Sequence, residues 1–310
     1  MNLNWYNSAA TEPLVQVVFL AGTGVFCRLS GILGEESVRD LSKLVLQVTL
    51  PLLLFVTGVQ SNLSRLFHQG LVVVTAGVFV PLLGYGVGAL VSRILRLSDR
   101  HSSVVRVTAS LSNTAFIGIP LCTAFWGAEG TLMAALFDFG LNVPLLTLPP
   151  LEYGRGATSM PWRILVFSPL VWGLILGLSC NWAGLAMPAW AATPLGVLGK
   201  VTLPLSLVLV GALVAPTKIG ADLLKPLAAL LVSRLVLAPL ATWILIRALG
   251  LHGTGAAVIV LQTAMPASVA ATVMAKEYGG EASLAAACAL LSVGFALLTV
   301  PLIAAGIRLG

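Results

Sequence analysis

Long apolar stretches follow one another along the whole chain, separated by short segments rich in Gly, Pro and charged residues. A helix needs about 20 apolar residues to cross the hydrocarbon core of a membrane. On that length scale the punctuation divides the chain into ten segments, which predicts an all-α, polytopic membrane protein with ten spanning helices. The expected spans are residues 13–33, 40–60, 70–95, 104–125, 131–152, 162–181, 192–215, 223–249, 254–275 and 283–307.

Composition strengthens this interpretation. Apolar residues occupy 58% of the 310 positions and charged residues only 9%, whereas about a quarter of a soluble domain is charged. A water-soluble globular fold is therefore excluded, and lipid is the expected surrounding partner. The net charge of +6 arises from Lys and Arg residues that are scattered and form no basic block, so we expect no nucleic-acid partner.

We expect no metal site, no cofactor and no removable leader. Cys27, Cys122, Cys180 and Cys288 occur singly, without a CxxC motif or a His at ligand spacing. The first 13 residues lack the basic region of a signal peptide, so the first apolar run is expected to remain as the first span.

Basic residues distinguish the two sides of the predicted bundle, because cytoplasmic loops are enriched in Lys and Arg. With the N-terminus outside, thirteen of the 17 basic residues fall on the inner side and four on the outer side. We therefore expect a multi-pass protein of the inner (plasma) membrane with both termini on the outer side. The inner group is Arg28, Arg39, Lys43, Arg93, Arg96, Arg100, Arg106, Arg155, Arg163, Lys218, Lys225, Arg234 and Lys276, and the outer group is Arg65, Lys200, Arg247 and Arg308.

Two halves of the chain share landmarks. The string VTLPL occupies residues 48–52 and again residues 201–205. Five spans are an odd number, so a second half of five spans must enter the membrane from the opposite side, as in inverted-repeat transporters. We expect halves at residues 1–155 and 156–310; chance recurrence of prolines, which are frequent in membrane helices, is the alternative. The matching prolines are Pro81 with Pro239, Pro120 with Pro266, and Pro144 with Pro301.

Two spans in matching positions are expected to be interrupted. Pro120 removes a backbone donor in the fourth span, where Gly118 permits an unwound backbone, and Pro266 lies in the middle of the ninth. The N-terminus of each half-helix would favour an anion. We therefore predict an anion site at the membrane midplane that needs no arginine inside the membrane.

These residues resemble a known family, the auxin efflux carriers in the broad sense, which include bacterial dicarboxylate carriers and plant auxin exporters. The stretch Asn113-Thr114 followed by Gly118-Ile119-Pro120 resembles the N-T-x-x-x-G-I-P crossover of the family's fourth helix. Further similarity covers nearly the whole chain. It includes Leu41 to Val45 leading to Pro51, Phe125-Trp126-Gly127, Ala264-Met265-Pro266, Ala275 to Gly279, Leu291-Ser292 and Leu298 to Pro301.

The resemblance implies a fold of the bile-acid-symporter and sodium–proton-antiporter type. Spans 1, 2, 6 and 7 would form a scaffold, and spans 3–5 and 8–10 a transport domain in which spans 4 and 9 cross. It implies that Asn113 holds a substrate carboxylate. The chain has Ala267 and Ala270 where many relatives place Asn after the ninth-helix proline. The expected substrate-binding residues are Asn113, Thr114, Gly118, Pro120, Gln262, Pro266, Ser268 and Pro51.

Asp138 is the only acidic residue placed well within a predicted span, where a carboxylate costs roughly 2.5 to 3.5 kcal/mol by insertion scales. One hypothesis is that Asp138 carries a coupling proton or lines a polar pathway. The alternative is a structural carboxylate, hydrated or hydrogen-bonded near a helix end.

The function expected from these features is secondary transport of a small organic anion by alternating access. A dicarboxylate such as malonate or malate is the first choice of cargo, followed by another monocarboxylate or an auxin-like acid. H⁺ or Na⁺ coupling and a homodimer are left open. An anion channel or a membrane sensor on the same fold is the alternative. An enzyme is not expected, because the spans contain no nucleophile with a base and no paired carboxylates.

Overall fold

The computed structural model describes residues 8–153, 166–185, 187–213 and 223–308, and within these ranges the chain is helical. The expected boundary between halves at 155/156 lies outside the described residues. Several expected spans consist of consecutive helices that form one rod, such as α2, η1 and α3. The elements of the first half are α1 (Ser8–Leu29), α2 (Glu35–Leu44), η1 (Val45–Thr49), α3 (Leu50–Val59), α4 (Leu63–Ile94), α5 (Asp99–Ser110), η2 (Thr114–Gly118) and α6 (Ile119–Tyr153).

The second half follows a similar order, with one rod formed by α10, η4 and α11 and a pair of short helices, α12 and α13, before the last long helix. Its elements are α8 (Pro169–Trp182), α9 (Ala189–Ala212), α10 (Leu224–Val232), η4 (Ser233–Leu237), α11 (Ala238–Ala248), α12 (Gly253–Thr263), α13 (Val269–Tyr278) and α14 (Ala282–Arg308).

Among the described residues, five helical stretches are long and apolar enough to cross a membrane, which makes this a multi-pass membrane protein. The stretch from Thr114 to Tyr153 bends at Gly127, whose φ and ψ are 57° and −139°. Shorter apolar helices, α8 and α12 among them, accompany the long ones. The five long stretches are Glu35–Val59, Gln69–Ile94, Thr114–Tyr153, Ala189–Ala212 and Leu224–Ala248.

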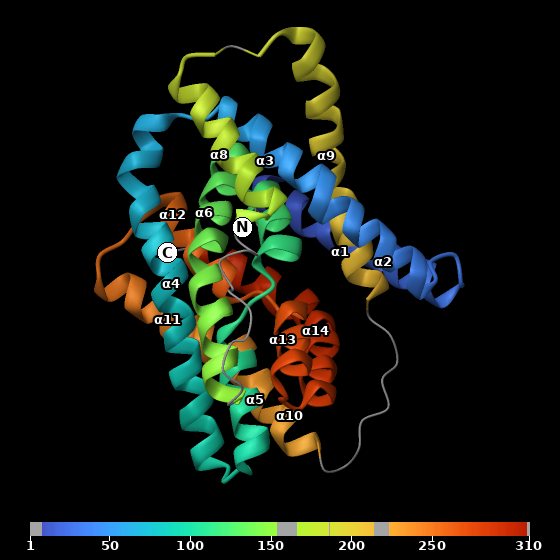
Figure 1. The fold of residues 1–310 in the computed structure, drawn as a ribbon, viewed down its shortest axis with the longest axis vertical. Helices are drawn as coiled ribbons and strands as arrows, with labels where there is room; N and C mark the ends of the chain where they lie inside the picture. Colours follow the sequence, from blue (N-terminus) through green and yellow to red (C-terminus); the bar gives the residue numbers. More distant parts are fainter. Residues whose placement is uncertain (1–7, 154–165, 186, 214–222, 309–310) are drawn as a thin grey trace, which may run out of the picture.

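The helices form two groups (Figure 1). Helices α1, α2, α3, α8 and α9 lie together in one part of the molecule, and α5, α10, α13 and α14 lie together in another, with α4 along the side. The first group is held by close backbone contacts: α1 packs on α9 and α3 packs on α8. At Gly24 of α1 a Cβ atom would lie 1.8 Å from the Val208 carbonyl oxygen, so only glycine permits this approach.

Within the described ranges, three π-helical turns each end two residues before a proline. They are η1 before Pro51, η2 before Pro120 and η4 before Pro239. A proline inside a regular α-helix removes a hydrogen bond and clashes with the carbonyl one turn earlier. The wider π-turn relieves both problems locally, so the helix continues. The expectation that span four breaks at Gly118 and Pro120 is therefore wrong, because both residues lie within continuous helix.

Two turns of the structure repeat one another 154 positions apart. After α4, the Arg96 amide donates to the Arg93 carbonyl at 3.1 Å and the Leu97 amide to the Ser92 carbonyl at 3.0 Å. After α11, Gly250 donates to Arg247 at 3.1 Å and Leu251 to Ile246 at 3.1 Å. Arg96 and Gly250 both adopt positive φ, at 51° and 65°. The α4–α5 turn and the α11–α12 turn thus have the same backbone design.

Candidate functional site

The candidate site lies where two interrupted helices meet. One interruption spans residues 111–113, between α5 and η2, and the other spans residues 264–268, between α12 and α13. The two pair as a single antiparallel β-bridge between Ser112 and Ala267. The Asn113 amide donates to the Pro266 carbonyl at 2.9 Å, and the Ser268 amide donates to the Leu111 carbonyl at 3.0 Å. The expected break at Pro266 is present, whereas its partner comes several residues before Pro120.

Four helix ends meet at this pairing, which we call the crossing (residues 111–113 and 264–268). Helices α5 and α12 end there, and η2, continuing as α6, and α13 begin there. Helix C-termini expose carbonyl groups with partial negative charge, and N-termini expose amides with partial positive charge. The crossing therefore brings two negative ends and two positive ends together in the interior of the bundle.

Arg234 occupies the negative ends. Its side chain is 1% exposed, and its Nε atom donates to the Met265 carbonyl at 3.0 Å. The Nη1 atom donates to the Ala109 carbonyl at 2.7 Å, and Nη2 donates to the Thr263 carbonyl. No ion pair of the described residues includes Arg234. One buried cation thus satisfies carbonyl groups from both interrupted helices.

This arrangement corrects two sequence-based expectations. Arg234 was assigned to the inner membrane side, but it lies in η4, buried at the crossing. The anion site was expected to need no arginine inside the membrane, and the crossing contains one. The sequence did contain a signal for the role of Arg234, because this residue lies within a predicted span. An ionisable residue inside the bilayer is costly and therefore indicates a functional site.

Asn113 begins η2 and is 8% exposed. Its backbone holds the crossing through its amide and through its carbonyl oxygen, which accepts from the Gly118 amide at 3.2 Å. Its side chain does not cap the helix. The backbone of Asn113 therefore serves the fold, while its carboxamide lies at the positive end of η2 without capping it.

Asp138 lies beside the same helix end. The Thr114 hydroxyl donates a hydrogen bond to the Asp138 carboxylate, and Thr114 is 1% exposed. The Asn142 carboxamide donates to the backbone carbonyl of Asp138 at 2.8 Å. The structure thus brings two predicted residues, Thr114 and Asp138, into direct contact one residue from Asn113.

Gln262 and Gly118 also meet. Gln262 is fully buried, and its amide nitrogen donates to the Ala134 carbonyl at 3.3 Å. A Cβ atom at Gly118 would lie 1.8 Å from Gln262 Oε1, so the glycine makes room for this carboxamide. Gln262 Oε1 accepts no hydrogen bond from the described residues. Gln262 therefore offers a buried acceptor next to η2.

The other residues expected to bind substrate lie in a helix cap, at buried helix positions or in the backbone of the crossing. The Ser268 hydroxyl caps α13 by accepting from the Ala270 amide at 3.1 Å. Pro120 is buried within α6. Pro51 is buried in α3, and its carbonyl faces Gly173 of α8, where a Cβ atom would lie 2.4 Å away. Pro266 contributes its carbonyl to the crossing.

Sequence reasoning missed other polar groups as well. Ser292 of α14 accepts a hydrogen bond from the Ala267 amide at 3.0 Å, which ties the last helix to the crossing. Thr49 and Thr202, the threonines of the two VTLPL strings, are 2% and 0% exposed. Neither hydroxyl has a hydrogen-bond partner among the described residues. The repeated string marked them as landmarks, but their burial could not be read from it.

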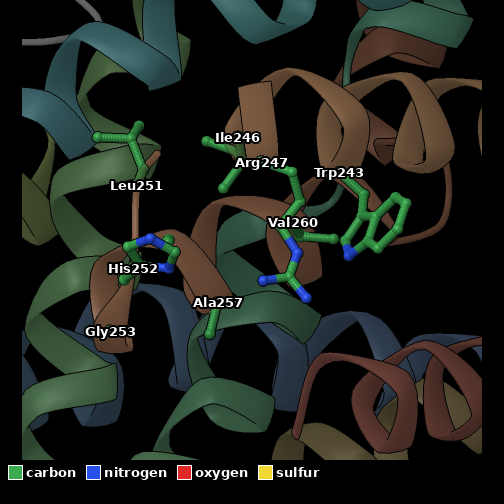
Figure 2. Close-up of a pocket in the computed structure, with 9 residues that line it drawn as sticks. Trp243, Ile246, Arg247, Leu251, His252, Gly253, Ala257 and Val260 are labelled. Carbon is green, nitrogen blue, oxygen red and sulfur yellow. The ribbon is translucent and has the colours of Figure 1, made fainter. Parts of the chain in front are cut away.

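A groove of about 120 Å³ follows α12 from its N-terminus toward the crossing (Figure 2). Arg247 lies in this groove between His252 and Trp243, with its guanidinium carbon 5.6 Å from the centroid of the Trp243 ring. Val260, one turn before the end of α12, also lines it. No cluster of three or more His, Cys, Asp or Glu with metal-binding geometry occurs within the described ranges.

Comparison with known proteins gives the family. A sequence profile described as "Membrane transport protein" matches residues 9–147 and 155–304. The chain belongs to this family. Its auxin-efflux-carrier resemblance is thereby confirmed, and the family points to a transporter rather than an enzyme.

Two archaeal relatives match nearly the full length of this membrane transport protein. An uncharacterized transporter of Methanothermobacter thermautotrophicus is 28% identical over 302 residues, covering 94% of this chain and 97% of the relative. An uncharacterized transporter of Methanocaldococcus jannaschii is 24% identical over 306 residues, covering 94% and 96%. The similarity extends across both interrupted helices and is not confined to one half.

Proposed function

We propose that this membrane transport protein is a secondary transporter that carries a small organic anion through the crossing by alternating access. Its ten predicted spans would form two inverted repeats. Spans 1, 2, 6 and 7 would act as a scaffold against which the transport domain of spans 3–5 and 8–10 moves. The protein would lie in the inner membrane with both termini outside.

The preference for an anion rests on the position of Arg234. Its guanidinium occupies the carbonyl ends of α5 and α12. The amide ends of η2 and α13, which favour negative charge, also lie at the crossing, with the Asp138 carboxylate beside η2. Because the negative ends are already neutralised by a buried cation, the electrostatic potential at the crossing favours an anion.

The inverted repeat is supported by contacts as well as by the 154-residue relation between the two turns. In an inverted repeat of five spans, span 1 corresponds to span 6 and span 2 corresponds to span 7. Helix α1 of span 1 packs on α9 of span 7, and α3 of span 2 packs on α8 of span 6. The symmetry would convert each of these two contacts into the other. The expected correspondence of Pro120 with Pro266 does not follow the 154-residue relation, because the position 154 residues before Pro266 is Ser112.

A dicarboxylate such as malonate or malate is the cargo we propose, with Asn113 and Gln262 as the carboxamides that hold it. Thr114 and Asp138 would connect the site to a coupling proton; a coupling sodium ion is the other choice. An anion channel on the same fold is the alternative, and electrical recording would show channel-like unitary flux without countertransport.

The test is uptake of labelled malonate and malate into proteoliposomes, with and without pH or sodium gradients. We expect saturable uptake by the unaltered chain, strong loss in Asn113→Ala, and little change in Gln60→Ala, a carboxamide on an exposed position. Uptake that persists in Asn113→Ala would remove the proposed site. No uptake of either acid under any gradient would remove the proposed cargo.

A further inference from the structure

A second groove, of about 490 Å³, lies between α4 and α5, at the turn that matches the α11–α12 turn. Its walls carry more charge than those of the matching groove. The polar residues that line it are Ser92, Arg93, Arg96, Asp99, Ser102 and Arg106.

Two of its three arginines have no ion-pair partner among the described residues. Arg106 is paired with Glu152 at 2.6 Å and also donates to the Ser102 hydroxyl at 2.8 Å. Arg93 and Arg96 are exposed, and the ion pairs of the described residues include neither. Asp99, at the start of α5, is the single acidic residue of the lining. The groove therefore has unneutralised positive charge at its mouth.

A buried hydroxyl also lines this groove. Ser92 is 2% exposed, and its Oγ atom has no hydrogen-bond partner among the described residues. An unpaired buried hydroxyl is costly unless a ligand or water satisfies it. Together with the two arginines, it supplies the donors that a phosphate group requires.

Comparison with the groove at the α11–α12 turn shows which features belong to the α4–α5 groove alone. Arg93 corresponds to Arg247, which lies over Trp243 (Figure 2). Arg96 corresponds to Gly250, and both have positive φ. Glycine adopts that conformation freely, whereas an arginine does so at a cost. The α4–α5 turn therefore carries a cation at a position where the backbone favours glycine.

The outer surface beside the groove is apolar. Leu90, which lines it, is 60% exposed, and Ile94 on the same helix is 68% exposed. Phe79 and Leu82 are also exposed large apolar residues of α4. In a membrane protein such a surface faces lipid tails. A ligand with a phosphate head and apolar chains would match both the groove and the helix face next to it.

We propose that the α4–α5 groove binds the phosphate-bearing head group of an anionic phospholipid. Arg93, Arg96 and the Ser92 hydroxyl contact the phosphate, and the acyl chains lie along Leu90 and Ile94. Basic pockets between membrane helices are known to bind such head groups. This inference rests on the membrane location of the chain and is independent of its cargo.

The test is native mass spectrometry of the detergent-purified full chain titrated with phosphatidylglycerol, and with phosphatidylcholine of the same acyl chains. We expect one saturable phosphatidylglycerol site. The double variant Arg93→Gln/Arg96→Gln should weaken it roughly thirtyfold, as expected for two cations near a lipid surface. Arg96→Gly should weaken it by severalfold while leaving thermal stability equal or higher, because glycine suits the turn.

Arg247→Gln, at the equivalent position of the other groove, is the matched control and should leave the affinity unchanged. Equal binding of both lipids, or equal loss in Arg247→Gln and the double variant, would overturn the proposal. Inorganic phosphate is added as a competitor. If phosphate binds the same groove and phosphatidylglycerol does not, the phosphate site stands and the lipid does not.

Discussion

The guanidinium of Arg234 donates a hydrogen bond of 2.7 Å to the Ala109 carbonyl, 125 residues earlier in the chain. Ala109 belongs to the last turn of α5, the first half of one interrupted helix, and the same guanidinium reaches the end of the other. A single side chain therefore joins the two halves of the molecule at the crossing.

Replacing Arg234 should destabilise the protein strongly. Arg234→Gln leaves buried carbonyl groups without donors, and each such group costs about 1 to 3 kcal/mol. We expect a loss of about 3 kcal/mol or more, measured as a lower thermal unfolding midpoint in detergent. Arg247→Gln, on the exposed end of α11, should change little. Equal midpoints for the two variants would contradict a structural role for Arg234.

A lysine at the same position separates charge from geometry. Arg234→Lys keeps the positive charge but cannot reach three carbonyl groups with fixed donors. We expect intermediate stability together with a retained preference for anions, measured as competition of uptake by anionic and neutral analogues. If Arg234→Lys folds but no longer prefers anions, the charge of Arg234 does not set the selectivity.

Gly24 and Gly22 form a matched pair for the contact between α1 and α9. A Cβ atom at Gly24 would lie 1.8 Å from a backbone carbonyl oxygen of α9, while a Cβ at Gly22 meets nothing within 4 Å. Gly24→Ala should therefore destabilise by about 1 to 3 kcal/mol through overpacking. Gly22→Ala should be neutral or stabilising by up to about 1 kcal/mol. Thermal unfolding of both variants tests the packing of these helices.

Gly118 and Gln262 should be energetically coupled. Gly118→Ala pushes the buried Gln262 carboxamide away from the Ala134 carbonyl, which should cost about 1 to 3 kcal/mol. In Gly118→Ala/Gln262→Ala the added methyl group finds space, so the double variant should lose less than the two single losses combined. A double-mutant cycle measures this coupling, and strict additivity would mean that the two residues do not meet.

Asp138→Asn tests the proposed proton coupling. The asparagine keeps the size of the side chain and a hydrogen bond to Thr114 but cannot exchange a proton. If Asp138 carries the coupling proton, uptake by Asp138→Asn should no longer respond to a pH gradient while exchange of labelled for unlabelled substrate continues. An unchanged response to the gradient would leave Asp138 with a structural role.

The sequence predicted the helical membrane fold well, because hydrophobic runs of spanning length need no tertiary information. The break at Pro266 was also predictable, since a proline in mid-span has a local effect. The break at residues 111–113 was not, because Leu111, Ser112 and Asn113 are neither Pro nor Gly. That interruption is instead paired with a segment more than 150 residues away. Long-range pairing of this kind leaves no local mark.

Other differences between the sequence-based expectations and the structure have related causes. Pro120 was expected to break its helix, but the π-turn η2 accommodates the proline without interruption. Arg234 was assigned to the nearest membrane side. That rule holds for residues in loops and fails for a buried side chain. The contact of Gln262 with Gly118 depends on the relative position of two helices, which composition and spacing do not specify.

The two interruptions are joined directly by main-chain hydrogen bonds, from Asn113 to Pro266 and from Ser268 to Leu111. These two hydrogen bonds do not depend on which side chains Asn113, Ser268 and Leu111 carry. Side chains at the crossing can therefore be exchanged without rebuilding the two main-chain hydrogen bonds that join the interrupted helices.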